Sequence, residues 1–111
     1  MPDDKKPGSV HLYSLRPEIL ERKIHELAAN SDNVLIPTDH SLERQDERSI
    51  TDEMMFRALR TGHIQDVMPG DEKGEWKCKM TKRTKEKREI GVVTVVLVND
   101  MLLIATVEWE D

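Results

Sequence analysis

Residues 90–109 read IGVVTVVLVNDMLLIATVEW, which is two apolar runs separated by Asn99-Asp100. The first run, Ile90–Val98, is rich in valine and apolar on both faces, which is typical of a central strand. Asn-Asp favours a tight turn, so Met101–Trp109 is expected to pair back as the last strand. This hairpin predicts that the domain is built on an antiparallel sheet.

The segment before the hairpin alternates between apolar and polar residues. One face carries Trp76, Cys78 and Met80, and the other carries Lys77, Lys79 and Thr81. A period of two is typical of a strand with one buried face, so we expect Trp76 in the core and Cys78 half-buried. His63–Met68 is an earlier expected strand, and residues 81–89 form a charged hairpin tip.

The first half of the chain has helical spacing instead. Apolar residues recur every three or four positions over an expected amphipathic helix, 17–29, with Pro17 in its first turn. After a short β-type run at 34–36, a second helix is expected, capped by Thr38 or Asp39 and ending at about Glu47 or Arg48. A third begins after Thr51, which caps it, and ends at Gly62.

This order predicts an α+β fold, with N-terminal helices packed on one face of a three- to four-stranded antiparallel sheet. We expect a flexible tail over 1–16, an extra N-terminal helix over 17–33 and a single α+β domain over 34–111. At 111 residues the chain fits one domain, and its 37% apolar content allows only a thin core.

Several protein classes are disfavoured by what the sequence lacks. It has no apolar run long enough to span a bilayer, no signal-peptide core and a single cysteine, Cys78, so we expect a cytoplasmic protein without membrane contact. The four histidines are scattered without zinc-ligand spacing, and neither a phosphate loop nor a nucleophile elbow is present. We therefore expect no metal and no cofactor.

Charge is strongly segregated along the chain. The formal net charge is −5, yet residues 73–88 contain eight Lys or Arg and two Glu. Lys77 and Lys79 on the expected strand, continuing into Lys82 and Arg83 at the tip, could follow an RNA phosphate backbone. The alternative is an exposed hairpin kept soluble by lysine.

The segment around residues 40–48 has the pattern of a phosphodiester site. His40, Arg44 and Arg48 are spaced i, i+4, i+8 and would lie along one stripe of a helix. Arginine forks grip phosphate oxygens and imidazole can move a proton. The alternative is a solvated helix face whose acids pair with the arginines.

Thr106 on the last expected strand is a polar residue in apolar surroundings. It shares a face with Glu108, opposite Ala105, Val107 and Trp109. Threonine also occurs in strands for structural reasons alone.

Taken together, residues 36–109 resemble a family of small bacterial proteins known as a domain of unknown function. The resemblance rests on the opening His40-x-x-x-Arg44-x-x-x-Arg48, a helix closed by Arg60-Thr61-Gly62, the turn beginning Pro69-Gly70 and the final apolar hairpin. Such proteins look similar to RelE-, MqsR- and barnase-like toxin ribonucleases, which place helices on a small antiparallel sheet. Ser49 stands where many members have glycine.

The resemblance implies a metal-independent endoribonuclease, the mRNA-interferase-type toxin of a toxin–antitoxin pair. His40 would be the general base or acid, Arg44 and Arg48 would grip the scissile phosphate, and Thr106 would support them. Lys77 or Lys79 would add charge on the sheet. The ribose 2′-OH would attack the adjacent phosphate and leave a cyclic phosphate.

Two other functions remain open. The first is a non-catalytic RNA- or protein-binding module of the same fold. The second is a structural homodimer joined through an open edge strand or the extra helix. The implied partners are RNA and a cognate antitoxin protein.

Overall fold

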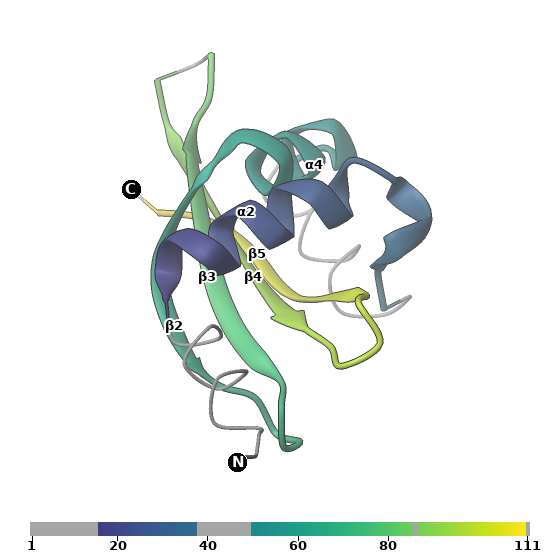
Figure 1. Cartoon of the computed structure of the whole chain (residues 1–111). Coiled ribbons are helices and arrows are strands. Elements are labelled where there is room, and N and C mark those ends of the chain that lie inside the picture. The colour runs from purple at the N-terminus through teal and green to yellow at the C-terminus, as the bar shows by residue number, and fades with distance from the viewer. Residues whose placement is uncertain (1–15, 38–49, 86, 111) are drawn as a thin grey trace.

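In the computed structural model, residues 16–37, 50–85 and 87–110 are described. The elements follow in the order α2 (Pro17–Ala28), a 3₁₀ turn η1 (Ser31–Asn33), β1 (Val34–Leu35), α4 (Asp52–Thr61), β2 (His63–Pro69), β3 (Trp76–Arg83), β4 (Glu89–Val96) and β5 (Leu102–Trp109). Helices lead and a run of hairpin-connected strands follows (Figure 1). The α+β class predicted from the sequence is confirmed.

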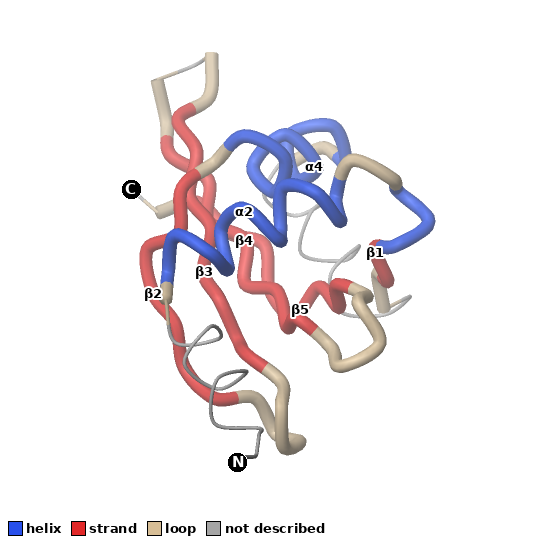
Figure 2. The backbone as a smooth tube through the Cα atoms, in the orientation of Figure 1, coloured by secondary structure: helices blue, strands red, loops and turns tan. Residues whose placement is uncertain are grey.

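The strands form one sheet in the order β1-β5-β4-β3-β2 (Figure 2). The four strands from β2 to β5 are antiparallel to their neighbours, as the hairpin pattern predicts. β1 adds a fifth, edge strand that runs parallel to β5, with Val34 opposite Leu102. The prediction of three to four antiparallel strands was therefore wrong in strand number and sheet type. A two-residue strand has no periodicity that could reveal its partner or direction.

Helices α2 and α4 pack on the same face of this sheet (Figure 1). Each helix buries one apolar stripe: Leu20, Ile24 and Ala28 from α2, and Met55, Ala58 and Leu59 from α4. Alternate residues of the strands pack against these stripes and are fully buried, including Cys78, Met80, Ile90, Val92 and Ile104. Removing this apolar surface from water is the main source of stability, at about 25 cal/mol per Å².

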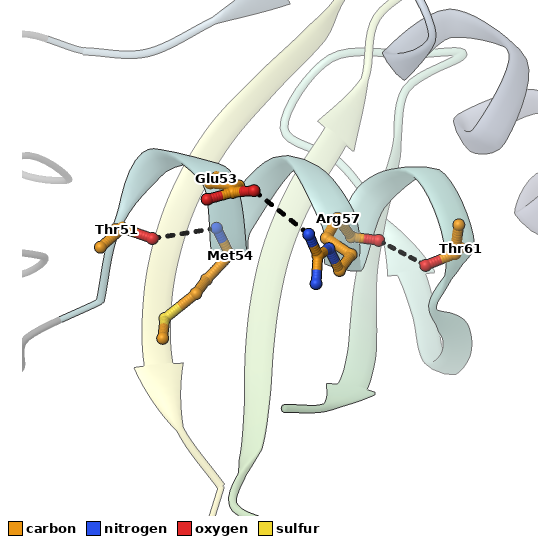
Figure 3. A network of polar contacts seen from close by, with 5 residues as sticks. All are labelled: Thr51, Glu53, Met54, Arg57 and Thr61. Atoms are coloured by element: carbon orange, nitrogen blue, oxygen red, sulfur yellow. Dashed lines mark hydrogen bonds and ion pairs between the residues drawn. The ribbon is translucent and has the colours of Figure 1, made fainter. Parts of the chain in front are cut away.

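The ends of α4 follow from local chemistry that the sequence shows. The Thr51 hydroxyl accepts a hydrogen bond from the Met54 amide at 3.1 Å, which satisfies one free N–H of the first turn (Figure 3). Asp52 and Glu53 add negative charge where the helix dipole favours it. At the other end Gly62 follows the last turn, and a side chain there would collide with the backbone at Ala58.

β5 changes the phase of its alternation at Ala105. Ile104 lies opposite Thr94 and Thr106 opposite Val93, so Ala105 is the extra residue of a β-bulge. The bulge allows Ile104 before it and Val107 after it to face the helices, and both are fully buried. The buried Thr94 hydroxyl donates a hydrogen bond to the Leu103 carbonyl at 3.1 Å beside this irregularity.

Polar contacts also fasten α2 to the rest of the fold. Ring atom Nε2 of His25 lies 2.8 Å from the Gly62 carbonyl oxygen, and Arg60 donates to the Ala28 carbonyl at 2.7 Å. A Glu21 carboxylate oxygen accepts from the Ile64 amide of edge strand β2 at 2.7 Å. The helix is therefore held by directional contacts as well as by its buried stripe.

Two side chains are more buried than the alternation predicts. Cys78 is fully buried rather than half-buried, and Thr81 is only 8% exposed although it lies on the polar face of β3. Trp76 is half-buried against the core, as expected. The expected helix over 38–48 and the tail up to residue 15 lie outside the described residues.

Candidate nucleic-acid interface

A cavity of about 400 Å³ lies between the first turns of α4 and the far end of β3. Its helix side is formed by Thr51, Glu53, Met54 and Arg57. Its hairpin side is formed by Lys82, Arg83, Thr84 and Lys85, with Ile90 of β4 between the two. We call this cavity the basic groove.

The described lining of the basic groove carries four cations and one carboxylate. Arg57 donates to Glu53 at 3.2 Å along the helix, with both side chains substantially exposed (Figure 3). Such an exposed pair contributes little stability, so Arg57 can exchange its partner at small cost. Lys82 is half-buried, while Arg83 and Lys85 are exposed. The groove is thus an accessible site of positive potential.

Hydrogen bonds shape the hairpin end that carries these cations. The amide and the hydroxyl of Thr84 both donate to the Arg88 carbonyl, at 2.7 and 2.9 Å. Arg83 donates through a terminal guanidinium nitrogen to the Lys87 carbonyl at 2.7 Å, and Lys87 has a left-handed φ of 64°. These hydrogen bonds therefore hold Arg83 and Thr84 against residues 87 and 88 on the other side of the hairpin.

A second group of the predicted site residues lies on the face of the sheet away from the helices. We call this face the open face. Lys79 of β3, Val93 of β4 and Thr106 of β5 are direct cross-strand neighbours in one row on it. Lys77 lies in the adjacent row, beside Val95, and is exposed. Lys77, Lys79 and Thr106 thus share a face that the basic groove does not use.

Lys79 is neutralised in this setting. Its ammonium lies 2.6 Å from a Glu110 carboxylate oxygen and 3.8 Å from one of Glu108. The hydrogen bond to Glu110 raises the pKa of Lys79 above its ordinary value and outweighs the opposing effect of burial. The negative charges of Glu110, Glu108 and, least, Asp66 raise it further. A phosphate would have to displace these carboxylates to reach this lysine.

The sequence-predicted site residues therefore divide into three groups. Lys82 and Arg83 line the basic groove, whereas Lys77, Lys79 and Thr106 lie on the open face. His40, Arg44 and Arg48 lie outside the described residues. The alternation of β3, continued past Thr81, places Lys82 on the face of Cys78 and Met80, opposite Lys77 and Lys79. This part of the division was therefore readable from the spacing.

Two groove residues were missed by sequence reasoning. Lys85 belonged to the basic tip, so its charge was a usable signal. Arg57 gave no such signal, since an arginine four residues after a glutamate is typical of any solvated helix. Its place in the groove depends on how α4 lies on the sheet.

Among the described residues, no three His, Cys, Asp or Glu side chains are grouped as a metal site would require. In the same part of the chain, no helix is both long enough and apolar enough to cross a membrane.

The fold and the groove define a small α+β protein with one helix-covered sheet and a cationic surface at its hairpin end. Residues 38–109 match the family model described as Domain of unknown function (DUF4258), and the chain belongs to that family. The sequence resemblance to a family of unknown function is confirmed at this level. No curated protein and no solved structure matches the chain.

Proposed function

We propose that the protein binds RNA in the basic groove and cleaves it as a metal-independent endoribonuclease, the toxin of a toxin–antitoxin pair. The RNA-binding part of this proposal rests on the charge of the groove lining, which has one carboxylate, that of Glu53, and four cations. The cations are those of Arg57, Lys82, Arg83 and Lys85. Phosphate contacts supply most of the sequence-independent affinity of nucleic-acid-binding proteins. The sequence resemblance to RelE- and barnase-like toxins supports the catalytic half of the proposal.

The proposed chemistry uses the predicted stripe of His40, Arg44 and Arg48. His40 would take the proton of a ribose 2′-OH as that oxygen attacks the neighbouring phosphorus. The bond from phosphorus to the 5′-oxygen would break, leaving a cyclic phosphate, and the departing 5′-oxygen would take a proton from water. The two arginines would neutralise charge on the phosphate. The chain reaches the groove at Thr51, three residues after Arg48, and three residues span at most about 11 Å.

A specific observation favours the second candidate, a non-catalytic RNA-binding module. The described lining of the basic groove contains no histidine, so those residues hold phosphate without an obvious proton carrier at neutral pH. For the ribonuclease, an acidic antitoxin segment would be the protein partner that competes for the groove. A homodimer is a further alternative. Thr106 has no role in the groove in either case.

The binding half is tested by a matched pair of lysines on β3. Lys82 lines the basic groove and Lys77 lies on the open face. Binding of single-stranded 2′-O-methyl RNA, which cannot undergo 2′-OH attack, is measured for Lys82→Ala and Lys77→Ala across a salt series. We expect only Lys82→Ala to weaken binding. The salt slope, which is the slope of the logarithm of the binding constant against the logarithm of the salt concentration, should become shallower by about 0.7 for this variant. Equal effects of the two changes would contradict the groove assignment.

The catalytic half needs a separate measurement. Wild-type protein and His40→Ala, checked for equal folding by circular dichroism, are incubated with RNA and with its 2′-deoxy counterpart in chelator. Cleavage of RNA alone, by wild type alone, with cyclic phosphate ends, supports the ribonuclease. Binding without cleavage by wild type would instead favour the non-catalytic module.

A further inference from the structure

The basic groove has an aromatic neighbour on the same face of the sheet. Ile90 on the floor of the groove pairs with Lys82 on one side and with Trp109 on the other. Directly paired residues point to the same face, so these three form one cross-strand row. Trp109 lies two strand spacings from Lys82, about 10 Å.

Trp109 carries a planar cation over its ring. Its ring packs partly against the core, and the guanidinium of Arg88 lies over the ring, 4.2 Å from its centre. Arg88 itself is exposed and precedes Ile90 by two residues, which puts it in the same phase of the strand alternation. In this layered pair, Trp109 lies between the core and the exposed guanidinium of Arg88.

From this arrangement we infer that Arg88 and Trp109 form a preformed stacking platform for one base of single-stranded RNA. Guanidinium planes and aromatic rings are the surfaces on which unpaired bases stack. Arg88 held over an indole loses little additional freedom on binding, because the cation–π contact already orients it. A strand whose phosphates follow the groove cations would bring a neighbouring base over this pair.

This inference rests on the proposed RNA binding and deepens it. Phosphate contacts at Lys82, Arg83 and Lys85 do not distinguish single strands from duplexes, whereas stacking requires an unpaired base. The platform therefore assigns the substrate class as single-stranded RNA. Stacking tolerates any base, so the platform favours unpaired segments without choosing a sequence.

The test compares two 2′-O-methyl oligonucleotides with the same backbone, one with all its bases and one with abasic positions throughout. Wild type is expected to bind the first about tenfold more tightly, which is within the range that stacking one base supplies. Arg88→Lys keeps the charge but removes the plane. Arg88→Lys should reduce the ratio of the two affinities, with bases over abasic, to about threefold or less. It should leave the salt dependence of binding unchanged.

Two further variants separate a platform from a structural role. Trp109→Phe keeps a ring under Arg88 and should retain much of the ratio, while Arg22→Lys on the exposed surface of α2 should retain all of it. If wild type binds both oligonucleotides equally, the platform is overturned while groove binding stands. If wild type binds neither, the proposed function fails and the platform fails with it.

Discussion

The carboxylate of Glu110 lies against the bare Cα of Gly91, in the space that any side chain at residue 91 would occupy. Gly91 is the middle member of a row between Thr81 and Glu108, so Glu110 reaches across β4 to meet Lys79 of β3. The Glu110 amide also donates to the Glu89 carbonyl at 2.7 Å, which holds the chain close to β4 beyond the end of β5. The missing side chain at Gly91 thus permits an ion pair between Lys79 of β3 and Glu110, which follows the end of β5.

The first prediction concerns the coupling of Gly91 with Glu110. Glu110→Gln in the wild type should cost about 1 kcal/mol of unfolding free energy, since the Lys79 pair is only partly shielded. In a Gly91→Ala background, where Glu110 is already displaced, the same change should cost almost nothing. Urea unfolding of the four proteins in a double-mutant cycle measures this. Additive effects would show that Gly91 does not control the pair.

The second prediction concerns Lys79 at high pH. The folded-state pKa of Lys79 lies above its ordinary 10.5, so the stability it contributes is fully present below that value. That stability is lost as pH rises through the raised pKa. The difference in unfolding free energy between wild type and Lys79→Gln should be constant from pH 7 to about 10 and shrink above it. A difference that persists unchanged to pH 12 would contradict this.

The third prediction concerns Cys78. Burial raises the pKa of its thiol from 9.0 to about 12, so the unfolded chain ionises first. The thiol's contribution to stability is complete below pH 9.0 and is lost between 9.0 and about 12, at about 1.4 kcal/mol per pH unit. Cys78→Ala lacks this slope, so urea unfolding of both proteins over that range isolates it.

A second readout for Cys78 is its reactivity. At pH 8 a thiol reagent should label the native protein only as fast as it unfolds, and should label it at once in urea. Rapid native labelling would show that the thiol is accessible.

The fourth prediction concerns α2, which lies outside residues 38–109 of the family match. Ile24 is fully buried between the helices and the sheet, so Ile24→Ala should lower the unfolding free energy by about 2–5 kcal/mol. Glu26→Ala, an exposed change on the same helix, should alter it by less than about 0.5 kcal/mol. Thermal unfolding of both variants provides the comparison. A small effect of Ile24→Ala would mean that the family domain is stable without this helix.

Local features of the fold were predictable because each depends on residues close together in sequence. Thr51 caps α4 and Gly62 ends it because a hydroxyl and a missing side chain act on the adjacent turn. The alternation over β3 correctly placed Lys77 and Lys79 opposite Cys78 and Met80. The charge excess of the hairpin was visible as composition, and it led directly to Lys82 and Arg83.

What stayed hidden depends on contacts between distant segments. Nothing near Val34 and Leu35 indicates that they join β5 as a parallel edge strand. The bulge at Ala105 reverses the phase of β5, and Thr94, whose hydroxyl donates to the Leu103 carbonyl beside the bulge, lies on another strand. The neutralisation of Lys79 by Glu110 required both strands to be in register.

Local patterns therefore predicted α2, α4 and the four hairpin-connected strands in their order, together with the buried stripes and the location of the excess positive charge. Periodicity, capping and turn chemistry are local, so each is readable from a few neighbouring residues. Three relationships appear only in the folded protein: Lys82 and Arg57 share a groove, Lys79 is paired on the other face, and Arg88 lies over Trp109. Those relationships arise from strand register and helix packing, which bring together residues that no local pattern connects.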